Sequence, residues 1–154
     1  MKISEILKKD FIIADLSGRD KADVLSELTS FLESKGAIKN KETLHSALID
    51  REKLGSTGIG ENVAIPHAKS EEIDQILTLF GRSTEGIEFD SLDKKPVHFV
   101  CLVVAPAHST GHHLKALARI ARLLKNQALR ENILKSQDEK EIYSHLLDED
   151  AKFI

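Results

Sequence analysis

Residues 97–104, VHFVCLVV, form the most apolar stretch of the chain. Apart from His98 and Cys101, every residue in this stretch is Val, Leu or Phe. β-Branched and aromatic residues favour strands, and a short, continuous apolar run is typical of a buried strand. We therefore predict a core β-strand here, ended by Pro106. Such a strand has to be covered by other elements, which indicates a layered domain.

The rest of the chain alternates between helical periodicity and short apolar runs. Apolar residues recurring at three and four positions predict helices over residues 20–35, 41–53, about 110–124, 127–135 and 138–147. Shorter strands are predicted over residues 11–16, 63–65, 75–82 and 87–89. The expected N-cap of the first helix is Asp20, and that of the third helix is either Ser109 or Thr110. The fold class is therefore α/β or α+β, with one domain over residues 1–147 and a frayed tail over 148–154.

Composition excludes several classes of protein. The 154 residues suit one domain, and 22 Lys and Arg against 25 Asp and Glu give a net charge of −3. This balance excludes an overall polycationic nucleic-acid binder. No apolar run is long enough for a transmembrane helix and no secretory signal is recognisable, so no membrane insertion is expected. Cys101 is the only cysteine, which rules out an intramolecular disulfide and makes a reducing cytoplasm the simplest compartment.

Residues 51–69, REKLGSTGIGENVAIPHAK, combine more functional residue types than any other segment. The glycine cluster at its centre is neither a P-loop nor a dinucleotide-binding motif, because no Gly-Lys-Ser/Thr follows and Val63 occupies the place of a third glycine. On their own the glycines indicate a tight turn between a helix and a strand. They would also allow backbone N–H groups to approach an anion. The candidate phosphate-site loop consists of Ser56, Thr57, Gly58 and Gly60.

His67 is the first candidate for catalysis. It follows a short apolar run and Pro66, whose ring fixes the backbone and so sets the position of the next residue. A neutral imidazole at the end of a strand, facing an open cleft, can attack a phosphoryl group. The alternative is a structural histidine hydrogen-bonded to the backbone.

A second histidine and an arginine complete the candidate site. His112 and His113 begin the long helix, where backbone N–H groups and the helix dipole favour anions. Successive helical residues point about 100° apart, so one of the two faces a given cleft, and the spacing to Leu117 favours His113. Arg51, at the end of a helix before the glycine loop, can bind phosphate through two N–H groups. The alternatives are surface histidines that cap the helix and an arginine paired with a neighbouring carboxylate.

Other chemistries are open but less well supported. His67, His108, His112 and His113 could supply a zinc or nickel site, but no HExxH motif and no HxxxH pair on one helix is present. Cys101 lies inside the most apolar strand and is expected to be an inert thiol. Ser56 and Thr57 lack the GxSxG sequence of a nucleophile elbow.

Residues 51–60, followed by VAIPH at 63–67, resemble the enzyme IIA domain of the phosphoenolpyruvate-dependent sugar phosphotransferase system. The resemblance is to the fructose/mannitol type, and most of all to its nitrogen-regulatory branch. It covers nearly the whole chain and includes His113-Leu114 at the start of the long helix. One departure is Ala68, which stands where the family often has glycine and is small enough to leave the site open.

The resemblance implies a mixed β-sheet flanked by helices on both faces, in a phosphocarrier that requires no metal or cofactor. It implies that His67 accepts a phosphoryl group from the carrier protein HPr, or a paralogue, and passes it to an enzyme IIB domain. His113 would be the second active-site histidine and Arg51 the phosphate-stabilising arginine. The alternative is a regulatory module whose docking to other proteins depends on phosphorylation of His67. The sequence specifies no sugar and no oligomeric state, and assigns no role to His108 or His112.

Overall fold

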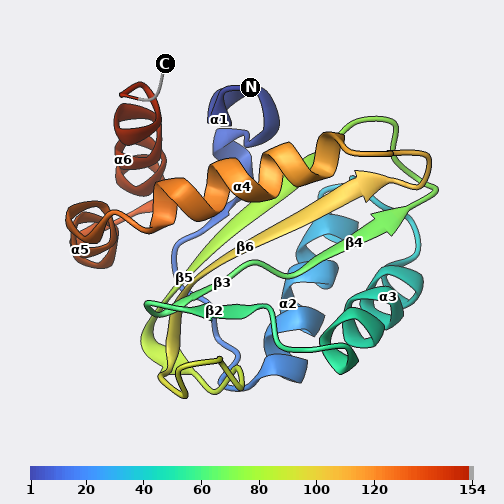
Figure 1. The fold of residues 1–154 in the computed structure, drawn as a ribbon, viewed down its shortest axis with the longest axis horizontal. Coiled ribbons are helices and arrows are strands. Elements are labelled where there is room, and N and C mark those ends of the chain that lie inside the picture. The colour runs from blue at the N-terminus through green and yellow to red at the C-terminus, as the bar shows by residue number, and fades with distance from the viewer. Residues whose placement is uncertain (153–154) are drawn as a thin grey trace.

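A six-stranded mixed β-sheet forms the middle layer of the protein (Figure 1), in a computed structural model that describes residues 1–152. The strands are β1 Ile12–Ile13, β2 Gly58–Gly60, β3 Val63–Ala64, β4 His67–Ser70, β5 Leu77–Ile87 and β6 Val97–Pro106. The helices are α1 Ile3–Ile6, α2 Lys21–Ser34, α3 Lys41–Lys53, α4 His112–Leu124, α5 Gln127–Lys135 and α6 Glu139–Asp150, with a short 3-10 helix, η1, at Lys9–Phe11.

The predicted core strand is confirmed as β6, which lies in the centre of the sheet. Nine of its ten residues are buried, and only His98 is half-buried. The strand pairs antiparallel with β5 and parallel with both β3 and β4. The strand order is β1-β5-β6-β3-β2, and β4 continues along β6 beyond β3. The break between β3 and β4 falls at Ile65 and Pro66, directly before His67.

Helices cover both faces of this sheet, as predicted. Helices α1, α4, α5 and α6 pack on one face over a core that includes Phe80, Phe99 and Ile120. Helices α2 and α3 pack on the other face over a core that includes Leu28 and Leu102. Both faces of β6 are therefore buried, which explains why its sequence is continuously apolar instead of alternating.

Three predicted strands turn out differently. The separate strands expected over 75–82 and 87–89 form one long strand, β5, with an irregularity in its register between Arg82 and Ile87. A bulge of this kind interrupts the alternation of side chains, so the sequence reads as two runs. The strand expected over 11–16 shrinks to the two residues of β1, because residues Lys9–Phe11 form the 3-10 helix before it.

The helix limits mostly agree with the prediction. Asp20 caps α2 by accepting a hydrogen bond from the backbone N–H of Asp23, and α3 has the predicted bounds. The predicted cap of α4 is wrong, since the helix begins at His112 with Gly111 as its N-cap and no side-chain capping bond. Leu114, in the first turn of α4, is 59% exposed and so lies outside the buried face of this helix.

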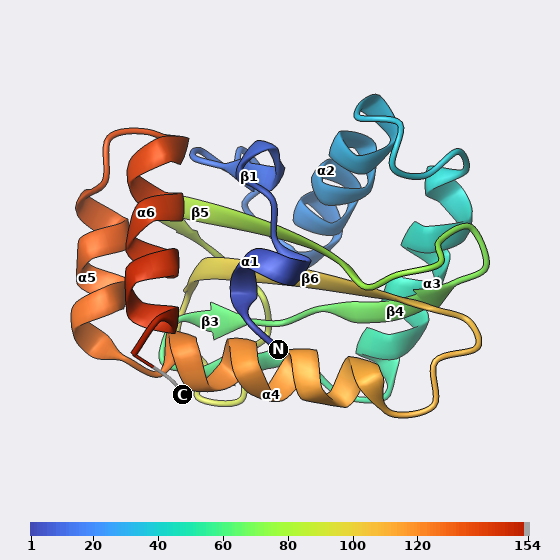
Figure 2. The ribbon, with the colours of Figure 1, turned by 90° about the horizontal axis from the view of Figure 1, so that it is seen from above.

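The predicted C-terminal tail, residues 148–154, begins inside helix α6. Helix α6 continues through Asp150, and the Asp150 carboxylate accepts hydrogen bonds from the Ile3 backbone N–H at 2.9 Å and from Arg119 Nε at 2.6 Å. The end of α6 therefore lies beside α1 and α4 (Figure 2). Of the expected tail, residues 153–154 lie outside the described residues. Within residues 1–152, no helix has both the length and the apolar character needed to cross a membrane.

Candidate active site

The corner between β3 and β4 holds His67 in one orientation. Pro66 lies in this corner, and its carbonyl accepts the Val103 N–H of β6 at 2.9 Å. His67 Nδ1 lies 3.0 Å from the carbonyl oxygen of Ile65. Because a carbonyl can only accept, Nδ1 carries the proton and Nε2 keeps its lone pair. The half-buried ring therefore presents Nε2 as the nucleophilic nitrogen.

Arg51 contacts this nitrogen directly. It lies in the last turn of α3, and its Nε–H donates to His67 Nε2 at 3.3 Å, although 16 positions separate the two residues. Its Nη1 donates to the Gly55 carbonyl at 2.9 Å. The guanidinium is thus held by two contacts: Nη1 binds the loop that follows α3, and Nε binds the imidazole of His67.

His113 reaches the same place from the first turn of α4. It lines a cavity of ≈ 340 Å³ together with Arg51 and His67; the other residues of this wall are Ala47, Ala68, Lys69, Val103, Ala105 and Leu117. Its Nδ1 lies 3.3 Å from Ser109 Oγ. Partial burial, followed by the positive charges of Lys69 and His67, lowers the pKa of His113. His113 is therefore a neutral imidazole near neutral pH.

A second cavity, of ≈ 320 Å³, adjoins the first and shares Arg51, His67 and Leu117 with it. Its other lining residues are Ser56, Thr57, Ile59, Ile65, Ala118 and Ala121. We refer to these two cavities together as the His67 cleft. The cleft is mainly apolar, with cationic and imidazole groups where the two cavities meet.

The glycines of the predicted phosphate loop do not line the His67 cleft. Gly58 lies in β2, and its N–H donates to Ser56 Oγ at 3.0 Å, so it is not available to an anion. A Cβ at Gly58 would come within 2.4 Å of Ser91 Oγ, which is why only glycine packs there. Gly60 has a positive φ of 97° at the β2–β3 hairpin. Both glycines therefore serve chain packing and turning.

Ser56 and Thr57 do lie at the cleft, but their hydroxyl groups bind protein atoms. Ser56 Oγ donates to the Phe89 carbonyl at 3.1 Å. Thr57 is buried and donates its hydroxyl hydrogen to the Glu52 carboxylate. Glu52 is not among the site residues predicted from the sequence. The one signal in the sequence that could have indicated Glu52 is its position directly after Arg51 at the end of a helix.

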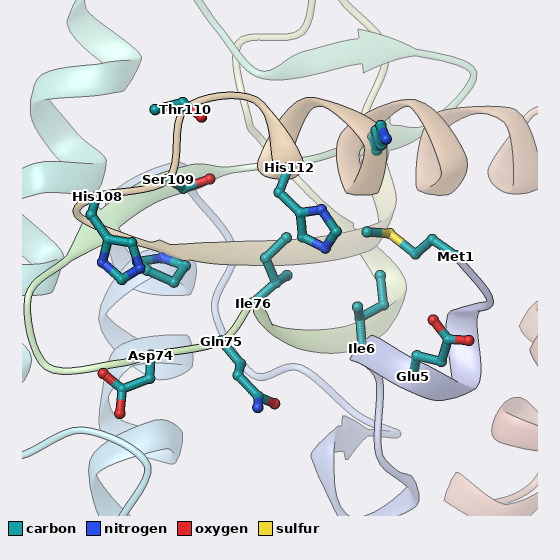
Figure 3. A pocket seen from close by; sticks show the side chains of 12 residues that line it. Met1, Glu5, Ile6, Asp74, Gln75, Ile76, His108, Ser109, Thr110 and His112 are labelled. Carbon is teal, nitrogen blue, oxygen red and sulfur yellow. The ribbon is translucent and has the colours of Figure 1, made fainter.

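The remaining histidines lie apart from His67. His108 and His112 line a larger cavity of ≈ 650 Å³ between α1, α4 and the segment before β5. Figure 3 shows His112 pointing from α4 into this cavity and His108 above Asp74. Within residues 1–152, no three His, Cys, Asp or Glu side chains are grouped as metal ligands. Burial raises the pKa of the Cys101 thiol to about 12, as expected for an inert thiol inside the core strand.

Comparison with known proteins decides the family. Residues 5–149 match the family model described as phosphoenolpyruvate-dependent sugar phosphotransferase system, EIIA 2. The chain belongs to this EIIA family. The resemblance noted from residues 51–67 is thereby confirmed, as is the fold that it implies.

The EIIA relatives include both transport and regulatory proteins. The chain is 40% identical over 147 residues to a nitrogen regulatory protein of Bradyrhizobium diazoefficiens, covering 95% of each chain. It is 35% identical over 142 residues to the fructose-specific EIIABC component of Bacillus subtilis, covering 92% of this chain but 22% of that protein. The chain thus corresponds to about a fifth of this larger relative.

Solved structures support the same EIIA fold. The nitrogen regulatory protein IIA-Ntr from Neisseria meningitidis superposes with a TM-score of 0.85 at 32% identity, covering 94% of this chain and 98% of that one. Enzyme IIAMtl of Escherichia coli, solved in a complex with phosphorylated enzyme IIBMtl, superposes with a TM-score of 0.78 at 19% identity and so shows the fold alone.

Proposed function

We propose that this EIIA-family chain is a phosphocarrier. His67 Nε2 accepts a phosphoryl group from the phosphohistidine of an HPr-type carrier protein and passes it to an enzyme IIB domain. The observation that supports this most strongly is the pair of contacts on one imidazole. The Ile65 carbonyl at 3.0 Å holds the proton on Nδ1, and Arg51 Nε lies 3.3 Å from the lone pair of Nε2.

The transfer step needs little covalent chemistry from the protein. The lone pair of His67 Nε2 forms the new N–P bond while the bond from phosphorus to the donor's ring nitrogen breaks, and that electron pair stays on the donor nitrogen. As the donor arrives, Arg51 Nε releases the His67 lone pair and donates to a phosphoryl oxygen, while Nη1 stays on the Gly55 carbonyl. Because the transferred group spreads its negative charge over three oxygens, a fixed guanidinium stabilises the transition state electrostatically.

His113 is the second group on the phosphoryl oxygens. In the tautomer whose Nδ1 accepts from Ser109 Oγ, the His113 ring carries its proton on Nε2 and can donate that proton to an oxygen. Since its pKa is lowered, His113 binds as a neutral donor and leaves Arg51 as the main cation. This balance favours a phosphoryl group that can leave again for the next protein.

A regulatory role is the second candidate. The 40% identity to a nitrogen regulatory protein extends over 95% of both chains, whereas the 35% identity to the fructose-specific EIIABC component covers 22% of that protein and the fructose-specific EIIA component of Haloferax volcanii is 29% identical. In this role phosphorylation of His67 adds about two negative charges to the His67 cleft and changes which proteins dock there.

Phosphorylation with a labelled donor tests the carrier function. We expect wild-type protein to gain acid-labile, base-stable phosphate from a phosphorylated HPr-type protein, and His67→Ala to gain none. His112→Ala is the matched control and retains the label, because His112 lies at the other cavity. Unlabelled wild-type protein, or label that persists in His67→Ala, rejects the proposal.

A second assay separates the two roles. Discharge of the labelled protein by an enzyme IIB domain supports transport. If no discharge occurs, the proteins that bind His67→Ala and His67→Asp are compared in a pull-down. Different bound proteins for the two variants support regulation.

A further inference from the structure

The carboxylate of Glu52 is buried next to the proposed phosphoryl site without being part of it. Its side chain is 4% exposed and pairs with Lys21 Nζ of α2 at 3.0 Å. The same carboxylate accepts the Thr57 backbone N–H at 3.0 Å and the Thr57 hydroxyl. Both carboxylate oxygens are thus bound, one by Lys21 and the Thr57 N–H and the other by the hydroxyl.

These bonds fix the loop on which Arg51 rests. Arg51 Nη1 donates to the carbonyl of Gly55, two residues before Thr57. Ser56, between them, is bound to the Phe89 carbonyl at 3.1 Å. Gly55 itself has a φ of 144°, and a Cβ there would meet nothing within 4 Å, so apart from its N–H bond to the Glu52 carbonyl at 3.1 Å no packing holds it in place. The contacts of Ser56 and Thr57 therefore set where the Gly55 carbonyl, and with it the guanidinium, can lie.

The same contacts control charge. Glu52 follows Arg51 in the sequence, and a free carboxylate there could pair with the guanidinium and compete with phosphoryl oxygens. Lys21 and Thr57 satisfy the Glu52 carboxylate instead, and Lys21 also neutralises its charge. The positive charge of Arg51 is left for the His67 cleft.

We infer that Glu52, acting through Thr57, is a positioning residue for Arg51: it holds the Gly55 loop so that Arg51 Nε points at His67 Nε2. This inference rests on the proposed phosphocarrier function. A positioning role has a kinetic signature, because a misplacement of about 1 Å in an aligned group slows the chemical step by up to roughly 100-fold. Donor affinity should change little.

The test compares Glu52→Gln and Thr57→Val with wild type in single-turnover phosphorylation from a phosphorylated HPr-type donor. We expect each variant to lower the rate at saturating donor by roughly tenfold with little change in KM. Thr57→Ser keeps the hydroxyl and should retain the wild-type rate. If Glu52→Gln does not fold, the comparison of Thr57→Val with Thr57→Ser decides the question. Wild-type rates in Glu52→Gln or Thr57→Val overturn the inference.

A double-mutant cycle distinguishes positioning from general damage. If Glu52 acts through Arg51, Glu52→Gln has no further effect on the rate once Arg51 is alanine. Glu27→Gln is the matched control, since Glu27 of α2 also holds loop N–H groups, those of Ser17 and Gly18. We expect that variant to transfer at the wild-type rate. Rate losses that multiply in the Arg51→Ala background contradict the inference.

The positioning claim is also measured without any donor. In ¹⁵N NMR spectra, the Arg51 Nε–H signal should shift in Glu52→Gln and stay unchanged in Glu27→Gln. If wild type accepts no phosphoryl group, the carrier function fails while this spectrum still tests the positioning. An Arg51 signal unchanged by Glu52→Gln overturns the positioning itself.

Discussion

In the proposed transfer, His67 acts as a nucleophile because its two ring nitrogens have different partners. The Ile65 carbonyl binds Nδ1 and the Arg51 side chain binds Nε2, so the two contacts fall on opposite sides of the ring. In the proposed transfer, Arg51 therefore already lies where it can bind a phosphoryl oxygen. The charge of Arg51 and the protonation of His113 can therefore be tested separately.

Arg51 should matter far more for transfer than for folding. We expect Arg51→Ala to slow phosphorylation of His67 by roughly 100-fold or more, the usual effect of losing one preorganised donor. Arg51→Lys should recover only part of the rate, because an ammonium lacks the fork that contacts both His67 and Gly55. Denaturant unfolding should show a stability loss of about 1 kcal/mol, since the residue is half-buried. A stability loss large enough to unfold the protein would contradict this.

His113 gives a pH prediction with a definite sign. Burial first, then Lys69 and His67, lower its pKa, so the unfolded chain binds the His113 proton at a higher pH than the folded chain. Stability contributed at this position should therefore fall as pH falls through the ordinary histidine range near about 6.5. An NMR titration of the His113 ring should have a midpoint below that range. Lys69→Gln should move the midpoint upward, and an unchanged midpoint would contradict the assigned cause.

At the scale of elements, the two ends of the chain are joined by one carboxylate. Asp150 is 4% exposed and connects α6 to the start of α1 and to Arg119 of α4. Helix α4 also carries His113, so this connection helps to hold the helix on the sheet. A short α1 of four residues depends on such tertiary contacts, because isolated helices of that length are unstable.

Replacing this carboxylate should therefore destabilise the fold. We expect Asp150→Asn to lower the free energy of unfolding by about 3 kcal/mol, as is usual when one partner of a buried pair is removed. Asp148→Asn, an exposed change on the same helix, should stay within about 0.5 kcal/mol of wild type. Chemical denaturation of both variants measures the difference. Equal stabilities would show that Asp150 is only part of a frayed end.

The sequence predicts elements well where one physical signal dominates. The apolar run of β6 and the capping Asp20 of α2 are local signals, and both are confirmed. The start of α4 is not, because Ser109 binds His113 instead of capping the helix. The helical end at Asp150 depends on Ile3, 147 positions away, which no local pattern reveals.

The site follows the same rule. The Pro-His corner is local, and the prediction that His67, Arg51 and His113 lie together agrees with the cavity they share. The prediction that Gly58 belongs to a phosphate-site loop is wrong. Gly58 is needed for packing against Ser91, a contact between distant segments. Glu52 was missed for a similar reason, since its partner Lys21 lies on another helix.

At the scale of the whole molecule, the fold keeps one end of the sheet open around the His67 cleft. Ile59 lines the cleft and is 43% exposed, and Leu114, the residue directly after His113, is 59% exposed. Exposed apolar groups around a charged centre suit a partner that must dock, exclude water and leave again. Residues that dock the partner protein should therefore be distinct from the residues that bind the phosphoryl group.

Leu114 provides the corresponding prediction. We expect Leu114→Ser to raise the KM for a phosphorylated HPr-type donor several-fold, while the rate at saturating donor and the melting temperature stay nearly unchanged. Leu134→Ser on α5 is the matched control, because Leu134 is also an exposed leucine but lines a cavity that shares no residue with the His67 cleft. A KM that changes equally in both variants would place the docking surface elsewhere.

The central claim is that Nε2 of His67, and no other atom, receives the phosphoryl group. Heteronuclear NMR of ¹⁵N-histidine-labelled protein, after phosphorylation by an HPr-type donor, measures this through the coupling between ³¹P and the ring nitrogen to which it is bonded. The account predicts one phosphorus signal, coupled to Nε2 of His67 and lost in His67→Ala. Coupling to Nδ1 of His67, or to a nitrogen of His113, would contradict it.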